Sequence, residues 1–204
     1  MFRFESIKNF DEHIDLSIPN YCSLRNIFKA FTLEYSSAGG KVVDIGCSTG
    51  SFLSSLPKRD GVNLVGIDVV DILEDKDLDF HLCSAHEYLE TATDVDVIIS
   101  MFTLQFMNKR DRKKTVDLIE HHVKNGATAL IAEKVLLPSR IDSVLKRQHI
   151  QAKREHFSDA DILDKEADLF GSMQCVEIHQ LESELVNPYK VWQSYNFVGY
   201  VSSL

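Results

Sequence analysis

The hydrophobic positions of this chain follow two periods in alternation. Short runs rich in β-branched residues predict strands, and the run at 95–100 is so apolar that both of its faces must be covered. Stretches with apolar residues at helical spacing, such as 22–35 and 110–124, predict helices. This alternation indicates an α/β fold with a parallel sheet and helices on both faces. The parallel strands are expected at 41–45, 63–67, 79–83, 95–100 and 127–133.

The pattern changes after the fifth expected strand. Residues 139–170 are helical in pattern and highly charged. Two further strand candidates, 174–179 and 194–201, predict a C-terminal antiparallel hairpin that closes the sheet. The turn region between them is marked by Asn187-Pro188.

The same pattern suggests how the chain is organised. Residues 1–20 lack a long period and are expected to form an N-terminal arm. Residues 21–204 are expected to form one domain, because a chain of 204 residues suits a single core. Residues 139–170 would be a helical insert within it, in which Ser158 and Asp161 have the spacing of a capping box.

Composition narrows the function classes. The net charge is −9, which disfavours tight binding to duplex nucleic acid because such surfaces need an excess of basic residues. The four cysteines are far apart and form no metal-binding pattern, so no metal site is expected. With neither a signal-peptide pattern nor an apolar run of membrane-spanning length, we expect a cytoplasmic protein without membrane partners.

The turn that follows the first expected strand carries the clearest chemistry. Gly46 and Gly50 flank a tight turn into a helix, where the backbone can approach a ligand closely and offer N–H donors. The second strand ends in Asp68, whose carboxylate can accept hydrogen bonds from both hydroxyls of a ribose. The two features together predict the cradle of an adenosine-containing cofactor. A dinucleotide is less favoured, because Ser48 stands where its pyrophosphate would need a glycine.

Other side chains near the strand ends are assigned by position. Asp44 is a charged residue in a buried strand, so it would order the turn or meet a cationic ammonium through water. Cys47 lacks a visible base, which favours packing over nucleophilic catalysis. The candidates for the acceptor side are Tyr21, Phe102, Gln105, His156 and Trp192, of which Tyr21, Gln105 and His156 are the candidates for catalysis.

Three segments together resemble a known family. The run 43–50, then Gly66-Ile67-Asp68, then 102–106 are similar to class I S-adenosylmethionine-dependent methyltransferases. Within that superfamily the chain most resembles the carboxy-S-adenosylmethionine synthases of tRNA wobble-uridine modification, to which 17–21, 132–134 and 195–197 are also similar. The resemblance implies a Rossmann-like seven-stranded sheet whose last strand runs antiparallel, and a homodimer. The cofactor residues expected from pattern and resemblance are Tyr21, Asp44, Gly46, Cys47, Ser48, Gly50, Asp68, Val69, Ser84, Ala85 and Met101.

The chain departs from those synthases at the position of an arginine that holds the extra carboxylate of their product, where it has Glu166. Ser84 likewise replaces an acidic residue and Met101 an asparagine. Three functions therefore stay open. The first is methyl transfer to an unidentified small-molecule or tRNA-pathway substrate. The second is carboxy-S-adenosylmethionine synthesis from prephenate, which predicts a basic pocket. The third is a non-catalytic regulatory module that only binds the cofactor.

Overall fold

The computed structural model describes residues 10–204, so the first nine residues of the expected N-terminal arm lie outside it. Seven strands follow one another in the order β3-β2-β1-β4-β5-β8-β7, and the short β6 pairs with β5 off this path. β8 alone is antiparallel to β5, and it pairs with β7 as a hairpin. The expected α/β fold with a mostly parallel sheet and an antiparallel C-terminal hairpin is confirmed. The strands are β1 Lys41–Ile45, β2 Asn63–Asp68, β3 Asp79–Leu82, β4 Val95–Met101, β5 Thr128–Leu136, β6 Val176–Glu177, β7 Pro188–Ser194 and β8 Phe197–Ser202.

Helices cover both faces of the sheet. On one face, α4, α5 and α8 pack on β1, β2, β4 and β5 through a core that includes Leu89, Ile119 and Leu181. On the other face, α2 and α3 pack through Leu24, Phe28 and Leu53. The helices are α1 Phe10–Ser17, α2 Tyr21–Tyr35, α3 Ser51–Ser54, α4 Ala85–Thr91, the short 3-10 turn η2 Leu104–Phe106, α5 Lys109–Lys124, α6 Ser139–Lys153, α7 Asp159–Leu169 and α8 Ile178–Ser183.

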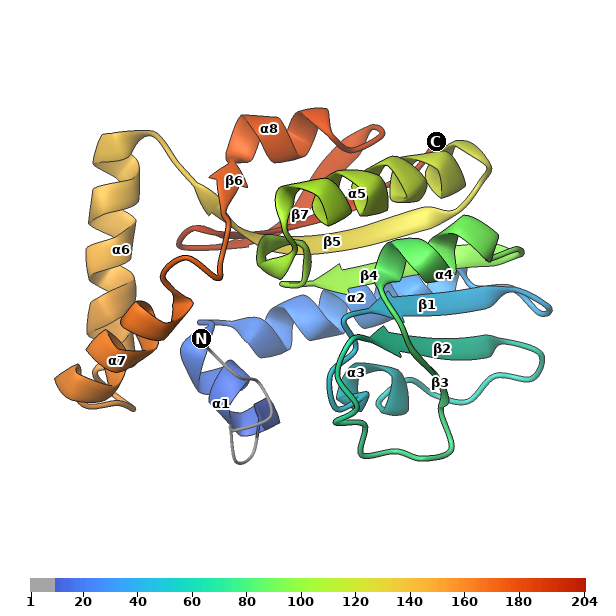
Figure 1. Cartoon of the computed structure of the whole chain (residues 1–204), viewed down its shortest axis with the longest axis horizontal. Helices are drawn as coiled ribbons and strands as arrows, with labels where there is room; N and C mark the ends of the chain where they lie inside the picture. The colour runs from blue at the N-terminus through green and yellow to red at the C-terminus, as the bar shows by residue number, and fades with distance from the viewer. Residues whose placement is uncertain (1–9) are drawn as a thin grey trace.

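Three helices stand apart from these layers. In Figure 1, α1, α6 and α7 lie together beyond the ends of β4 and β5, at the end of the sheet where the parallel strands finish. The expected capping box of α7 is confirmed, because the hydroxyl of Ser158 accepts from the amide of Asp161 at 3.2 Å while the Asp161 carboxylate accepts from Ser158. Within the expected N-terminal arm, residues 10–17 form the helix α1.

The predicted position of the first hairpin strand was wrong. Only Val176 and Glu177 of the expected strand 174–179 are extended, and the chain turns into α8 at Ile178. The first hairpin strand is instead β7, and Asn187-Pro188 marks its start and not the turn of the hairpin. The physical reason is that Ile178 and Leu181 have helical spacing and bury that face of α8 in the core.

Candidate functional site

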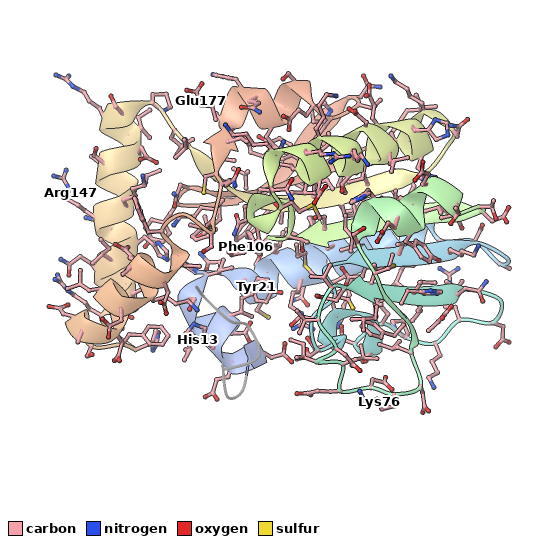
Figure 2. All side chains as sticks on the ribbon, in the orientation of Figure 1. His13, Tyr21, Lys76, Phe106, Arg147 and Glu177 are labelled. Atoms are coloured by element: carbon pink, nitrogen blue, oxygen red, sulfur yellow. The ribbon has the colours of Figure 1, made fainter. Side chains whose placement is uncertain are left out.

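A cavity of about 440 Å³ lies where β1, β2 and β4 end, in the size range of small-molecule sites. The parallel strands end on the same edge, so residues distant in sequence meet there. Figure 2 shows His13, Tyr21 and Phe106, from α1, α2 and η2, gathered at this end of the sheet, whereas Arg147 on α6 points away from the body. Of the predicted site residues, the cavity is lined by Tyr21, Asp44, Gly46, Cys47, Ser48, Asp68, Val69, Ser84, Ala85, Met101, Phe102 and Gln105.

The turn after β1 is held to the tip of β2. The amides of Gly46 and Cys47 both donate to the carbonyl of Ile67, at 2.7 and 3.0 Å. Gly46 has φ of +72°, and a Cβ at this position would lie 2.3 Å from Oγ1 of Thr103. Only glycine combines that conformation with so close an approach, which opens the backbone toward the cavity.

Asp68 is fixed by both of its carboxylate oxygens. Oδ2 accepts from the amide of Ser48 at 2.9 Å and Oδ1 accepts from the amide of Val70 at 3.1 Å. Burial raises the pKa of Asp68, and these amide donors oppose the rise. Each oxygen keeps a lone pair that can accept from a ligand hydroxyl. The carboxylate is therefore pre-positioned at the cavity wall.

Asp44 is the most unusual acid of the site. It is 2% exposed and lines the cavity. Burial raises its pKa to about 8, repulsion from Asp68 adds to the rise, and Arg25 opposes it. Burying a carboxylate is costly unless its charge is balanced by a cation. The site thus has a place for a positively charged ligand group.

The cavity wall above the turn comes from α1, which the sequence pattern did not reveal. The carboxylate of Asp11 accepts from the hydroxyls of Ser51, at 2.9 Å, and Thr49, at 3.2 Å. At the other end of α1, the carbonyl of Ser17 accepts from Nε2 of His149 on α6 at 2.9 Å. Because a carbonyl only accepts, this bond places the proton of the neutral imidazole on Nε2. α1 is thereby fastened at both ends across the site.

Three lysines from three elements line the opposite side of the cavity. They are Lys134 on β5, Lys153 on α6 and Lys165 on α7. Burial lowers the pKa of each, to about 8 for Lys165, and repulsion between neighbouring lysines lowers the pKa further. His13 also lines this side, and its buried Nε2 has no hydrogen-bond partner among the described residues. The cavity thus has an acidic end at Asp44 and Asp68 and a basic end at the lysines.

The loop that follows β4 connects the acidic end of the cavity with its basic end. Phe102 has φ of +58° and its ring packs between Tyr21, at 6.1 Å between centroids, and Phe197, edge-on at 5.7 Å. Gln105, a candidate for catalysis, has its side-chain Oε1 occupied by the amide of Lys134 at 2.9 Å. Its carbonyl accepts from the amide of Gln174. Gln105 is therefore built into the wall of the cavity.

Some predicted residues lie away from the cavity. His156 is exposed in the connection between α6 and α7, and Trp192 is 7% exposed in the core under α2. Gly50 serves packing, since a Cβ there would meet Leu73 at 2.7 Å. Cys47 lines the cavity, but burial and the nearby Asp44 raise the pKa of its thiol. A thiol with a raised pKa is a weaker nucleophile at neutral pH.

Comparison with known proteins decides the family. A model described as a methyltransferase domain matches residues 20–168. The chain belongs to this methyltransferase domain family. Its curated relatives include carboxy-S-adenosyl-L-methionine synthases from Hydrogenovibrio crunogenus, 22% identical over 98% of this chain and 88% of the relative, and from Staphylococcus epidermidis, 32% identical over 66% and 63%. The expected membership of the S-adenosylmethionine-dependent methyltransferase superfamily is confirmed, and the family is one of transferase enzymes.

Solved structures show the same methyltransferase fold. A SAM dependent methyltransferase from Archaeoglobus fulgidus superposes with a TM-score of 0.55 at 13% identity, over 88% of this chain and 94% of that one. Human N-acetylserotonin methyltransferase, in complex with SAM, gives 0.53 at 12% identity over 89% and 54%. In this methyltransferase-family chain, no group of side chains suited to a metal ion occurs among residues 10–204. Nor does any helix of that part have the length and apolar character to span a membrane.

The structure places two of the positions at which the chain was expected to differ from the synthases. Glu166 is exposed and does not line the cavity, whereas its neighbour Lys165 does. The hydroxyl of Ser84 donates to Glu87 at 2.6 Å and closes the start of α4. Glu87 thus serves the capping box of α4 and does not line the cavity.

Proposed function

We propose that this chain transfers a methyl group from S-adenosylmethionine to a small anionic acceptor. The observation that carries the proposal is Asp68, held through Ser48 and Val70 so that its carboxylate meets the ribose of the cofactor at the tip of β2. The Gly46 turn would take the amino-acid part, and Ser84 and Ala85 would flank the adenine. The small volume and the cover formed by α1 favour a small molecule over a tRNA as the acceptor.

The chain itself needs little catalytic machinery for this reaction. When bound, S-adenosylmethionine supplies a sulfonium that activates its own methyl group. Asp44 is placed to balance the positive charge of the cofactor, which answers the cost of its burial. Phe102 and Tyr21 exclude water beside the acceptor. Positioning and desolvation are sufficient sources of rate for a transfer of this type.

Binding of S-adenosylhomocysteine, measured by isothermal titration calorimetry, tests the cofactor site. We expect micromolar affinity for the wild-type chain and a loss of at least tenfold for Asp68→Ala, in line with a lost hydrogen bond to a charged group. Asp60→Ala, at an exposed position, is the matched control and should bind as the wild type does. No binding by the wild-type chain would contradict the proposal.

A second candidate is carboxy-S-adenosylmethionine synthesis from prephenate, which would place the chain in a tRNA-modification pathway. The lysines at the basic end of the cavity favour it, because they offer the basic pocket that this reaction needs. Incubation with both substrates, followed by mass spectrometry of the nucleoside, tests this candidate. A product heavier by one carboxyl group supports it, and an unchanged nucleoside excludes it. Lys153→Met should reduce the yield, whereas Lys29→Met, at a residue that does not line the cavity, should not.

We further propose that the chain is a cytoplasmic homodimer that pairs through α6. Ile141 and Val144 on this helix are 54% and 47% exposed, and α6 stands at the edge of the molecule (Figure 1). Apolar side chains grouped on one exposed helix face favour an interface. Light scattering should give the mass of a dimer for the wild-type chain and of a monomer for Val144→Glu. Ser143→Glu, at another exposed position of the same helix, is the control for charge.

A further inference from the structure

The loop that follows β4 is hydrogen-bonded to a buried carboxyl group on β5. Glu133 on β5 is 2% exposed and does not line the cavity. Its Oε1 accepts from the amide of Leu104 at 3.0 Å. Burial raises the pKa of Glu133 to about 8, while Arg112 and the backbone N–H groups of residues 103–105 oppose the rise. The carboxyl group of Glu133 thus lies close to the backbone N–H groups at the start of η2.

This loop has a conformation that needs support. Phe102, immediately before it, is a bulky residue with φ of +58°. Such a backbone persists only where its surroundings hold it, since it costs on the order of 1 kcal/mol or more. The ring of Phe102 forms part of the cavity wall beside Tyr21. A relaxed loop would move this ring.

The same loop also sets the shape of the Gly46 turn. The side chain of Thr103 occupies the space where a Cβ on Gly46 would stand, so the two segments are packed without a gap. Gln105 continues the loop and binds the amide of Lys134. The segment held by Glu133 therefore touches both the turn at the acidic end and the strand residue at the basic end.

From these contacts we propose that Glu133 is a positioning residue that holds Phe102 and Thr103 in the geometry required for cofactor binding. The inference rests on the proposed function, because it concerns the same cavity. Glu133 acts through the backbone of η2 and touches no ligand itself. Arg112 does not depend on Glu133 for a partner, since it pairs with Glu184 at 2.7 Å.

A matched pair of variants tests the inference. Glu133→Gln keeps an oxygen that can accept from Leu104, whereas Glu133→Met has similar length and no acceptor. We expect Glu133→Gln to bind S-adenosylhomocysteine within about threefold of the wild type, and Glu133→Met at least tenfold more weakly. The melting temperature of Glu133→Met should also fall, because the buried amide of Leu104 loses its acceptor, so a measurement that locates the change is needed beside it.

Hydrogen exchange separates positioning from general destabilisation. Amides of residues 102–106 should exchange faster in Glu133→Met than in Glu133→Gln, with the amides of β4 and β5 unchanged. Equal affinity and equal exchange in the two variants would overturn the inference. If the wild-type chain does not bind S-adenosylhomocysteine, the proposed function fails, and the exchange comparison still tests the hold on the loop. If Glu133→Met does not fold, Glu133→Thr, which suits a strand and is too short to reach Leu104, replaces it.

Discussion

The hydroxyl of Ser51 donates to the carboxylate of Asp11 at 2.9 Å and so ties α1 to the first residue of α3. Thr49 donates to the same carboxylate, which makes Asp11 the point where α1 meets the Gly46 turn. Five residues of α1 and its C-terminal extension line the cavity: Asp11, His13, Ile14, Ser17 and Ile18. Access to the proposed cofactor site thus depends on how firmly this helix is held.

Asp11→Ala should accelerate release of S-adenosylhomocysteine. The two hydroxyls would lose their acceptor, and α1 would remain tied mainly through the bond between Ser17 and His149. We expect the dissociation rate, measured by stopped-flow fluorescence, to rise about tenfold with a smaller effect on association. Asp15→Ala on the exposed side of the same helix should behave as the wild type. An unchanged dissociation rate in Asp11→Ala would show that α1 does not limit release.

Asp44→Asn should weaken cofactor binding and increase the stability of the folded chain. The folded chain raises the pKa of Asp44 to about 8 from an ordinary value near 4, so the folded state binds a proton more tightly than the unfolded state does. The stability contribution of this group is therefore greatest at acidic pH and declines as the pH rises from about 4 to 8. Asparagine removes that decline.

Thermal unfolding and calorimetry measure both effects of Asp44→Asn. Its gain in unfolding free energy over the wild type should be larger at pH 8 than at pH 5, on the order of 1 to 3 kcal/mol. It should also weaken S-adenosylmethionine more than S-adenosylhomocysteine, which lacks the sulfonium charge. A gain that is the same at both pH values would contradict the raised pKa.

Gly46→Ala should abolish tight cofactor binding. The new Cβ would overlap Thr103 and the residue would be strained at φ of +72°. We expect a loss of at least tenfold in affinity for S-adenosylhomocysteine and a loss of about 2 kcal/mol or more in unfolding free energy. Gly126→Ala is the matched control, because it has φ of +105° and nothing within 4 Å of its Cβ. It should cost only the backbone strain, about 1 kcal/mol, and leave binding intact.

The basic end of the cavity should bind anions best below pH 8. Lys165 has a pKa of about 8 because it is buried near Lys153, so it loses its charge as the pH rises past that value. With S-adenosylhomocysteine present, affinity for malonate, a small dicarboxylate, should fall several-fold between pH 7 and pH 9. Lys165→Gln should bind malonate weakly at both pH values. A flat pH profile in the wild-type chain would argue against this role for Lys165.

Local patterns were enough to predict the turn and the sheet. The strand at 41–45 was predicted with its observed bounds, and Gly46, Ser48 and Asp68 were correctly placed at one edge. These residues follow strands directly, so their meeting is a consequence of parallel pairing between β1 and β2. A chain with this alternation has few other ways to bury its apolar runs.

The positions of the lysines at the basic end of the cavity, and of α1 at its wall, could not be predicted because they depend on tertiary packing. Asp11, Lys153 and Lys165 come from helices whose position over the end of the sheet no local period reveals. The hairpin was misplaced because Val176 and Ile178 alternate like a strand while Ile178 and Leu181 are spaced like a helix. The helix forms because Ile178 and Leu181 lie on one helical face and are buried together in the core that contains β5. His156 lies in the exposed turn after α6 and does not line the cavity.

Lys165 and Glu166 are consecutive in α7, yet one lines the cavity and the other meets water. Each step along a helix rotates the side chain by about 100°, so a shift of a single residue reverses the charge that a bound molecule would encounter. In this chain α7 therefore presents a cation to the cavity through Lys165, while the carboxylate of the next residue stands in water and still acts to raise the pKa of Lys134 and Lys153, which burial lowers.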